Sequence, residues 1–231
     1  MTALKLLSAG AVKGGVSQIA DAYARATGTP VEVAFTQGHR LRQRIIDGEA
    51  ADVVVAPDTL MNEFAAAGRI VPATRALAGR SRVGVVVHRN ATAPDVSNTE
   101  AFRRALLAAS TVAHNDASSG IYVAQLLERL GLKAPLGERI VVVTSGAAIM
   151  ETVAARGAGA IGLGQISEIM VMIGKGCAVK MIAPLPDDIQ HVSVYHAAAC
   201  SASATPEAAA ALARELTADA AKKIFAATGI D

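Results

Sequence analysis

Short apolar runs alternate with amphipathic segments along most of the chain. The runs predict strands at 4–7, 31–35, 52–56, 82–88, 111–113, 140–143, 160–163, 179–182 and 190–198. The amphipathic segments predict helices at 10–27, 39–47, 57–67, 100–109, 120–130, 147–155, 167–173, 206–216 and 218–227. Strands that alternate with helices in this way are typical of parallel βαβ units. We therefore expect an α/β fold of mostly parallel sheets flanked by helices.

Two longer strands, 82–88 and 191–198, separate the short units and are the expected crossings between two lobes. One lobe would contain residues 1–80 plus 191–231, and the other residues 81–190. In open α/β sheets ligands bind beyond the carboxyl ends of the strands. Helix N-termini at that edge carry free N–H groups and a partial positive charge, which favours anions. The pattern thus predicts an anion site in a cleft between the lobes, with the two crossing strands as a hinge.

Composition narrows the class of protein. Of 231 residues, 52% are apolar but only 3% are aromatic, so the core must consist mainly of Ala, Val, Ile and Leu. The 22 basic and 20 acidic residues give a net charge of +2, and neither a basic patch nor stacking aromatics support a nucleic-acid partner. No apolar stretch has the roughly 18–20 residues that membrane insertion needs.

Cysteines, histidines and the N-terminal residues give further expectations. Cys177 and Cys200 lack metal or redox spacing, so two free thiols are favoured over a single bridge. The five histidines have no metal-ligand spacing, and no nucleophile motif is present, so we expect neither a metal nor a cofactor. The N-terminus lacks the basic and apolar regions of an export signal, which predicts a cytoplasmic location, or a periplasmic one if such a signal was trimmed.

Polar and small residues mark the predicted turns from strand to helix. The candidate ligand-binding residues are Ser8, Ala9, Gly10, Ala11, Gln37, Gly38, Arg40, Ser118, Ser119, Gly120, Ser145, Gly146 and Gln165. Arg40 falls in a first helical turn, where a cation is unfavourable unless an anion binds there. Arg42 and Arg44 are expected on the surface. Helix capping explains one of Ser118 and Ser119 and leaves the other hydroxyl for a ligand.

Several strings in these turns resemble the type II periplasmic binding proteins, and especially their molybdate-binding subgroup. They are LSAGAVKGGV at 7–16, VEVAFTQG at 31–38, GEAADVVVAP at 48–57, SSGIY at 118–122, GLGQISEI at 162–169 and AAKKIF at 220–225. The resemblance covers essentially the whole chain. It implies a two-lobed fold that closes around a small solute.

The sequence departs from the molybdate pattern where that pattern supplies hydroxyl groups. Ala11 and Gln37-Gly38 occupy the positions of two serines, and Leu163 occupies that of a tyrosine. Losing one such donor to a buried oxyanion costs roughly 1–3 kcal/mol. The remaining donors suit a carboxylate with several oxygens better than a compact tetrahedral oxyanion.

Two functions from different classes follow from the resemblance. The first is a solute-binding protein for a small di- or tricarboxylate, with an ABC transporter as partner if the chain is exported. The alternative is a cytoplasmic isomerase of unsaturated tricarboxylates, because this group includes aconitate-isomerase-like relatives. Isomerisation needs a base near a carbon-bound proton, and His39 or Lys13 are the candidates. A cytoplasmic ligand sensor is a third possibility, although no DNA-binding element accompanies it.

Overall fold

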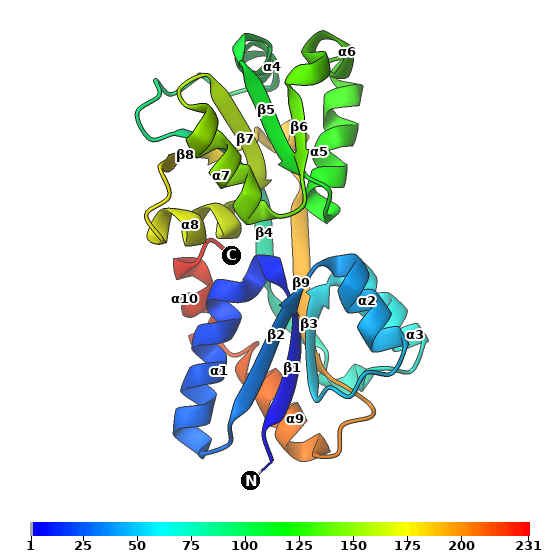
Figure 1. Cartoon of the computed structure of the whole chain (residues 1–231). Helices are drawn as coiled ribbons and strands as arrows, with labels where there is room; N and C mark the ends of the chain where they lie inside the picture. The colour runs from blue at the N-terminus through cyan, green and yellow to red at the C-terminus, as the bar shows by residue number, and fades with distance from the viewer. Residues whose placement is uncertain (1) are drawn as a thin grey trace. The chain divides into compact units, whose positions relative to one another are not determined.

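The computed structural model describes residues 2–231 and divides into two compact units (Figure 1). Unit 1 contains the chain up to Ser81 together with Ser193–Asp231, and unit 2 is Arg82–Val192. Strand β4 (Ala76–His88) begins in unit 1 and ends in unit 2. Strand β9 (Val192–Ala199) leads the chain back into unit 1. Two long strands therefore carry the chain between the units.

Unit 1 is built on a parallel sheet. Strand β1 (Leu4–Ala9) pairs in parallel with β2 (Val31–Thr36) and with β3 (Val53–Pro57), and β9 pairs antiparallel with β3. The accompanying helices are α1 (Lys13–Thr27), α2 (Gly38–Ile46), α3 (Asp58–Ala66), α9 (Pro206–Glu215) and α10 (Asp219–Ala227). Each parallel strand is followed directly by a helix, as the βαβ pattern predicts.

Unit 2 repeats this construction. Strand β5 (Thr111–Asn115) pairs in parallel with β6 (Ile140–Val143) and β7 (Ala160–Gln165). Strand β4 pairs antiparallel with β7 and with β8 (Val179–Pro184). The helices are α4 (Thr99–Ala108), α5 (Ser118–Arg129), α6 (Lys133–Leu136), α7 (Gly146–Arg156) and α8 (Ile166–Gly174).

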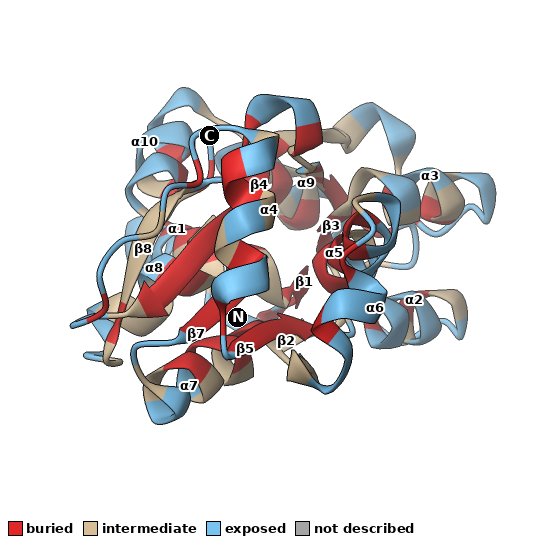
Figure 2. Ribbon diagram, turned by 90° about the horizontal axis from the view of Figure 1, so that it is seen from above, coloured by how far each residue is buried: buried red, intermediate tan, exposed pale blue. Residues whose placement is uncertain are grey.

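Strands β1, β3, β5 and β7 are almost entirely buried, whereas β2, β6 and β8 are mostly half-buried (Figure 2). In β3, Val53, Val54, Val55 and Ala56 are all 0% exposed, which explains why this strand reads as a continuous apolar run. Aliphatic residues and alanine supply most of the core, and Phe64, Phe102 and Phe225 are its fully buried phenylalanines. The core composition is therefore the one expected from the scarcity of aromatic residues.

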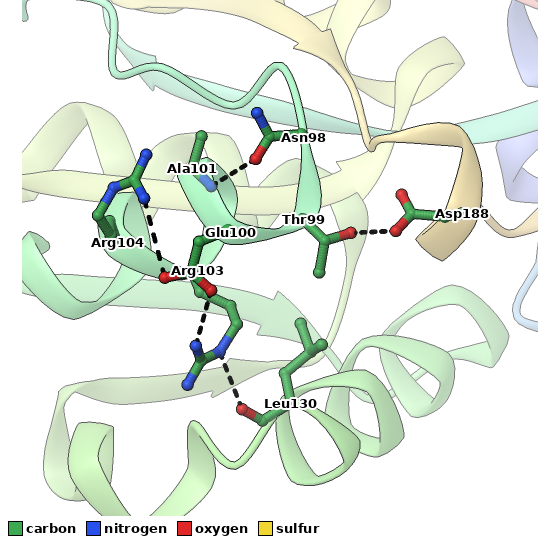
Figure 3. Close-up of polar contacts among 8 residues, drawn as sticks. All are labelled: Asn98, Thr99, Glu100, Ala101, Arg103, Arg104, Leu130 and Asp188. Carbon is green, nitrogen blue, oxygen red and sulfur yellow. Dashed lines mark hydrogen bonds and ion pairs between the residues drawn. The ribbon is translucent and has the colours of Figure 1, made fainter.

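Helix α4 shows how polar contacts fix the elements of unit 2 (Figure 3). The Asn98 side chain caps the helix by accepting the Ala101 N–H at 2.9 Å. The Thr99 hydroxyl donates to Asp188 at 2.6 Å, and Arg103 donates to the Leu130 carbonyl at 3.2 Å. One helix therefore ties together the 3₁₀ turn Asp187–Ile189 and the end of α5.

The α/β fold is confirmed, but several local expectations change, among them the start of β4, which begins at Ala76 instead of at residue 82. The segment 10–27 opens with a 3₁₀ turn, Gly10–Val12, before α1 begins. Helix α6 was not expected, since it has only four residues. The prediction that Ser118 or Ser119 caps α5 is wrong, because Ala117 is the N-cap residue and both serines lie inside the helix. Helix ends shift easily by a residue or two, and capping depends on the exact position.

The other chemical expectations can be compared with the described residues. Cys177 and Cys200 are free thiols, and burial together with the Asp52 carboxylate raises the pKa of Cys200 to about 12. Within residues 2–231, no three His, Cys, Asp or Glu side chains are grouped so that they could hold a metal ion. In the same range no helix has the length and apolar character needed to cross a bilayer.

Candidate functional site

The carboxyl ends of β1, β2 and β3 lie at one edge of unit 1, because the three strands are parallel and adjacent. The 3₁₀ turn Gly10–Val12, helix α2 and helix α3 begin at this edge. No N-cap side chain accepts a hydrogen bond at any of these three starts. Backbone N–H groups at uncapped helix starts attract anions. We call this the unit 1 edge.

The first loop of the unit 1 edge offers backbone rather than side-chain donors. Ser8 is 0% exposed, and its hydroxyl donates to the Ala9 carbonyl at 3.0 Å. That hydroxyl hydrogen is therefore already used within the protein. Gly10 and Ala11 are partly exposed and follow it at the surface. A ligand at this loop would be held mainly by backbone N–H groups.

Positive charge accompanies the start of α2. Gln37 is its N-cap residue, Gly38 begins the helix, and His39 and Arg40 are exposed in its first turn. Arg42 and Arg44 form ion pairs with Glu63 and Glu49, as expected of surface residues. Arg40 makes no ion pair or hydrogen bond with any residue in the described part of the chain.

The Lys13 ammonium adds a second cation to the unit 1 edge. It lies 5.3 Å from the centroid of the Phe35 ring, near the end of β2. A cation over a ring face is weakly attracted to it and keeps a preferred position. Lys13 is exposed, so its charge is available to a solute.

The unit 1 edge also contains a cluster that sequence reasoning did not identify. Asp58 begins α3, and its carboxylate accepts from Arg75 at 2.5 Å and lies 3.3 Å from Nδ1 of His196. Burial and the nearby Arg75 lower the pKa of His196, while Asp58 opposes the shift. The imidazole is therefore neutral at pH 7, and Arg75 is the cationic partner of Asp58. This pairing holds the start of α3 against β9.

The carboxyl ends of β5, β6 and β7 form the corresponding edge of unit 2, again because the strands are parallel neighbours. Helices α5, α7 and α8 begin just after these strands. We call this the unit 2 edge. The candidates at positions 118–120, 145, 146 and 165 lie on it, so the structure brings these residues together within one unit.

Helix α5 begins very close to β5. Ser118 is exposed, whereas Ser119 and Gly120 are buried. A Cβ at position 120 would overlap both the main-chain and side-chain oxygens of Asn115, so glycine is required for this approach. Asn115 is 2% exposed, and its amide oxygen has no hydrogen-bond partner among the described residues. Asn115 is a further candidate ligand-binding residue, which sequence reasoning did not identify.

Helix α7 begins with a capped turn. The Ser145 hydroxyl oxygen accepts the Ala148 N–H at 3.2 Å. Because capping uses only the oxygen, the hydroxyl hydrogen can still be donated to a ligand. Gly146 follows and is buried, and a Cβ there would overlap the carboxylate of Glu168. The side chain of Glu168 therefore lies directly against the start of α7.

Glu168 lies in the first turn of α8, three residues after the buried N-cap residue Gln165. Burial raises the pKa of the Glu168 carboxyl to about 7. The carboxylate makes no hydrogen bond or ion pair with another residue in 2–231. Sequence reasoning missed it because an acid in a first turn is ordinary helix chemistry. Leu163, which stands where the molybdate pattern has a tyrosine, is 1% exposed and belongs to the core of unit 2.

Tyr122 and His191 are structural residues of unit 2. The Tyr122 hydroxyl donates to the Ile189 carbonyl at 2.7 Å, and its ring stacks on His191 at 4.6 Å between centroids. Both contacts attach the segment before β9 to α5.

A pocket of about 350 Å³ in unit 1 is lined by the middle of β1 and β2 together with Arg44 and Glu49. It lies away from the unit 1 edge and includes none of the candidate residues.

Comparison with known proteins places the fold among binding proteins. A family model described as bacterial extracellular solute-binding protein matches residues 4–231. An aconitate isomerase from Pseudomonas sp is 31% identical, over 97% of this chain and 86% of that protein. The periplasmic molybdate-binding protein of Azotobacter vinelandii has a TM-score of 0.80 at 20% identity, covering 99% of this chain and 98% of that one.

The fold is not confined to one ligand. The sulfate-binding protein SubI of Mycobacterium tuberculosis H37Rv has a TM-score of 0.77 at 17% identity, covering 100% of this chain and 86% of that one. At such identities the likeness concerns the fold alone, because one fold hosts many solutes.

Proposed function

Because the chain belongs to the bacterial extracellular solute-binding protein family, we propose that it binds a small di- or tricarboxylate. The observation that carries this proposal is the exposed Arg40 in the first turn of α2, without an anionic partner in residues 2–231. A cation is unfavourable at a helix N-terminus unless an anion lies beside it. A carboxylate bound by the guanidinium and by the N–H groups of α2 removes that conflict.

The distribution of donors favours several carboxylates over one tetrahedral oxyanion. The Ser8 hydroxyl is committed to the Ala9 carbonyl, and Ala11 has no hydroxyl. What remains at the unit 1 edge is backbone N–H groups, Arg40 and Lys13. At the unit 2 edge the donors that remain for a ligand are the Ser145 hydroxyl and the backbone N–H groups at the start of α5. A ligand with carboxylates on separate carbons can use donors that lie on different helices.

We further propose that donors of both units bind the same ligand molecule and that binding closes the units on it. The support for this proposal is the chain path, in which β4 and β9 alone lead from one unit to the other. A ligand that contacts both units favours a closed form by the difference in its affinity for the closed and open states.

Isothermal titration calorimetry with citrate, tricarballylate, cis-aconitate, malate, molybdate and sulfate tests the ligand class. We expect a tricarboxylate to bind, and Arg40→Ala to weaken its affinity roughly 10- to 100-fold, since a hydrogen bond to a charged group contributes about 1.5–3 kcal/mol. Arg25→Ala is the matched control, because Arg25 is exposed near the end of α1. Submicromolar molybdate binding with no response to carboxylates would contradict the proposal.

A second candidate function, isomerisation of an unsaturated tricarboxylate, is supported by the 31% identity to an aconitate isomerase. A 1,3-shift of the double bond removes a proton from the allylic methylene and returns one to the former vinyl carbon. The helix N-termini that bind the carboxylates would stabilise the negative charge that develops between these steps. Incubation of cis-aconitate with the protein in deuterated water, followed by NMR, tests this function. Trans-aconitate and deuterium incorporation are expected.

A further inference from the structure

We propose that Glu168 is the catalytic base and acid of this isomerisation, an inference that rests on the second candidate function. The carboxylate would take the allylic proton, which breaks a C–H bond and leaves the electron pair delocalised over the allyl carboxylate. The same carboxyl would then return the proton to the other end of the allyl system, forming the new C–H bond. No oxidant, reductant or further reactant is needed.

The position of Glu168 is the first reason. Its carboxylate lies over Gly146, between the starts of α7 and α8, at the edge where Ser145 and Gln165 also lie. Glu168 is partly exposed, so a solute at this edge can reach it. A carbon acid bound by the helix N-termini would therefore lie within reach of a carboxylate that is itself fixed by packing against a glycine.

The absence of a structural role is the second reason. Among the described residues nothing donates a hydrogen bond to the carboxylate or pairs with its charge. A half-buried carboxylate without partners is less stable than one that lies in solvent. An acid that served only the helix dipole of α8 could point outward from the same first turn. Groups kept in such unfavourable surroundings are concentrated at functional sites.

The third reason is that the carboxyl is suited to proton transfer near neutral pH. Burial is the only resolved cause of its pKa of about 7. The elements packed against α8 are α7, β7 and β8, and their charged residues are Glu151, Arg156 and Lys180. None of these three residues contributes to the raised pKa of Glu168. A group whose pKa lies near the working pH is both a better base than an ordinary carboxylate and a sufficient acid. The other candidate bases, His39 and Lys13, lie at the unit 1 edge among the groups that we assign to carboxylate binding.

The experiment measures deuterium exchange and isomerisation of cis-aconitate, with affinity measured separately by calorimetry. Glu168→Gln should lower kcat at least 100-fold while affinity stays within a few fold, because general acid–base catalysis contributes roughly 10²–10⁴. Glu168→Asp should restore part of the rate. Gly146→Ala, whose methyl group would displace the carboxylate, should also lower kcat. Glu151→Gln, an exposed glutamate on α7, is the matched control and should leave the rate unchanged.

The pH profile adds a readout that a structural role would not move. The wild-type kcat should rise with pH and level off above about 7, because the ionised carboxylate is the base. Retention of the wild-type rate by Glu168→Gln would overturn the proposal. So would a result in which His39→Ala loses proton exchange and Glu168→Gln keeps it. If wild-type protein binds the acid but neither isomerises it nor exchanges a proton, the catalytic role is wrong while carboxylate binding stands. If it binds no tricarboxylate, both proposals fail.

Discussion

Replacing Glu168 by glutamine should change how the stability of the ligand-free protein depends on pH. The folded carboxyl has a pKa of about 7, whereas the ordinary value is 4.5. The folded state binds this proton more tightly than the unfolded state does. The contribution of the carboxyl to the free energy of unfolding is therefore fully present below pH 4.5 and is lost as the pH rises through 7. Glutamine has a similar shape and never ionises, so Glu168→Gln avoids this loss.

The magnitude follows from the shift. At about 1.4 kcal/mol per pH unit, the difference between 4.5 and about 7 corresponds to about 3 kcal/mol. The N-termini of α7 and α8 stabilise the anion by roughly 0.3–1 kcal/mol each, which reduces the expected effect to about 2 kcal/mol. Glu168→Gln should therefore be more stable than wild type by about this amount at pH 8, and equal to it below pH 4.5.

Urea denaturation followed by circular dichroism at several pH values measures the difference in free energy of unfolding. Other titrating groups cancel when the variant is compared with wild type at the same pH. Glu151→Gln, which replaces an exposed glutamate of the same unit, serves as the matched control. A flat difference between pH 4.5 and 8 for Glu168→Gln would refute the reasoning, since the carboxylate would then ionise without cost in the folded state.

Two further predictions concern the unit edges and their closure. Gly120→Ala should lower the free energy of unfolding by about 1–3 kcal/mol or more, because its methyl group would overlap Asn115. Gly10→Ala, where an added Cβ meets nothing within 4 Å, should change it little, and an equal cost in urea denaturation would contradict this. Saturation with a tricarboxylate should reduce the radius of gyration in small-angle scattering. An unchanged profile at calorimetric saturation would exclude closure.

The order of strands and helices could be predicted because each buried strand reads as a short apolar run and each helix has an amphipathic period. The residues at the turns follow from that order, since parallel strands bring their carboxyl ends to one edge. The positions of Ser145 at the start of α7 and Arg40 at the start of α2 were predicted in this way, and their role in binding stays a prediction. The predicted capping of α5 by Ser118 or Ser119 was wrong because the helix begins two residues before the predicted start at Gly120, which places both serines inside it.

Residues that depend on contacts between distant segments could not be predicted. His196 reaches Asp58 only because β9 pairs antiparallel with β3, which places it opposite Ala56. The strand pattern specifies neither the partner nor the register of β9. Glu168 has no local feature that separates it from a solvated first-turn acid, and only its packing against Gly146 reveals its burial. Asn115 is similar, because its unpartnered oxygen depends on the close start of α5.

The two edges differ in a way that bears on function. The unit 1 edge combines Arg40, Lys13 and uncapped helix starts, a set that attracts anions and contains no unpaired acid among the described residues that we assign to it. The unit 2 edge carries a carboxylate, which repels an anion once it is ionised. A protein that only bound carboxylates would bind them more tightly with a neutral residue at position 168. The lower affinity caused by an ionised carboxylate is understandable if that carboxylate acts on the bound acid. Glu168→Gln should therefore bind a tricarboxylate as well as wild type does, or better, while it loses proton exchange.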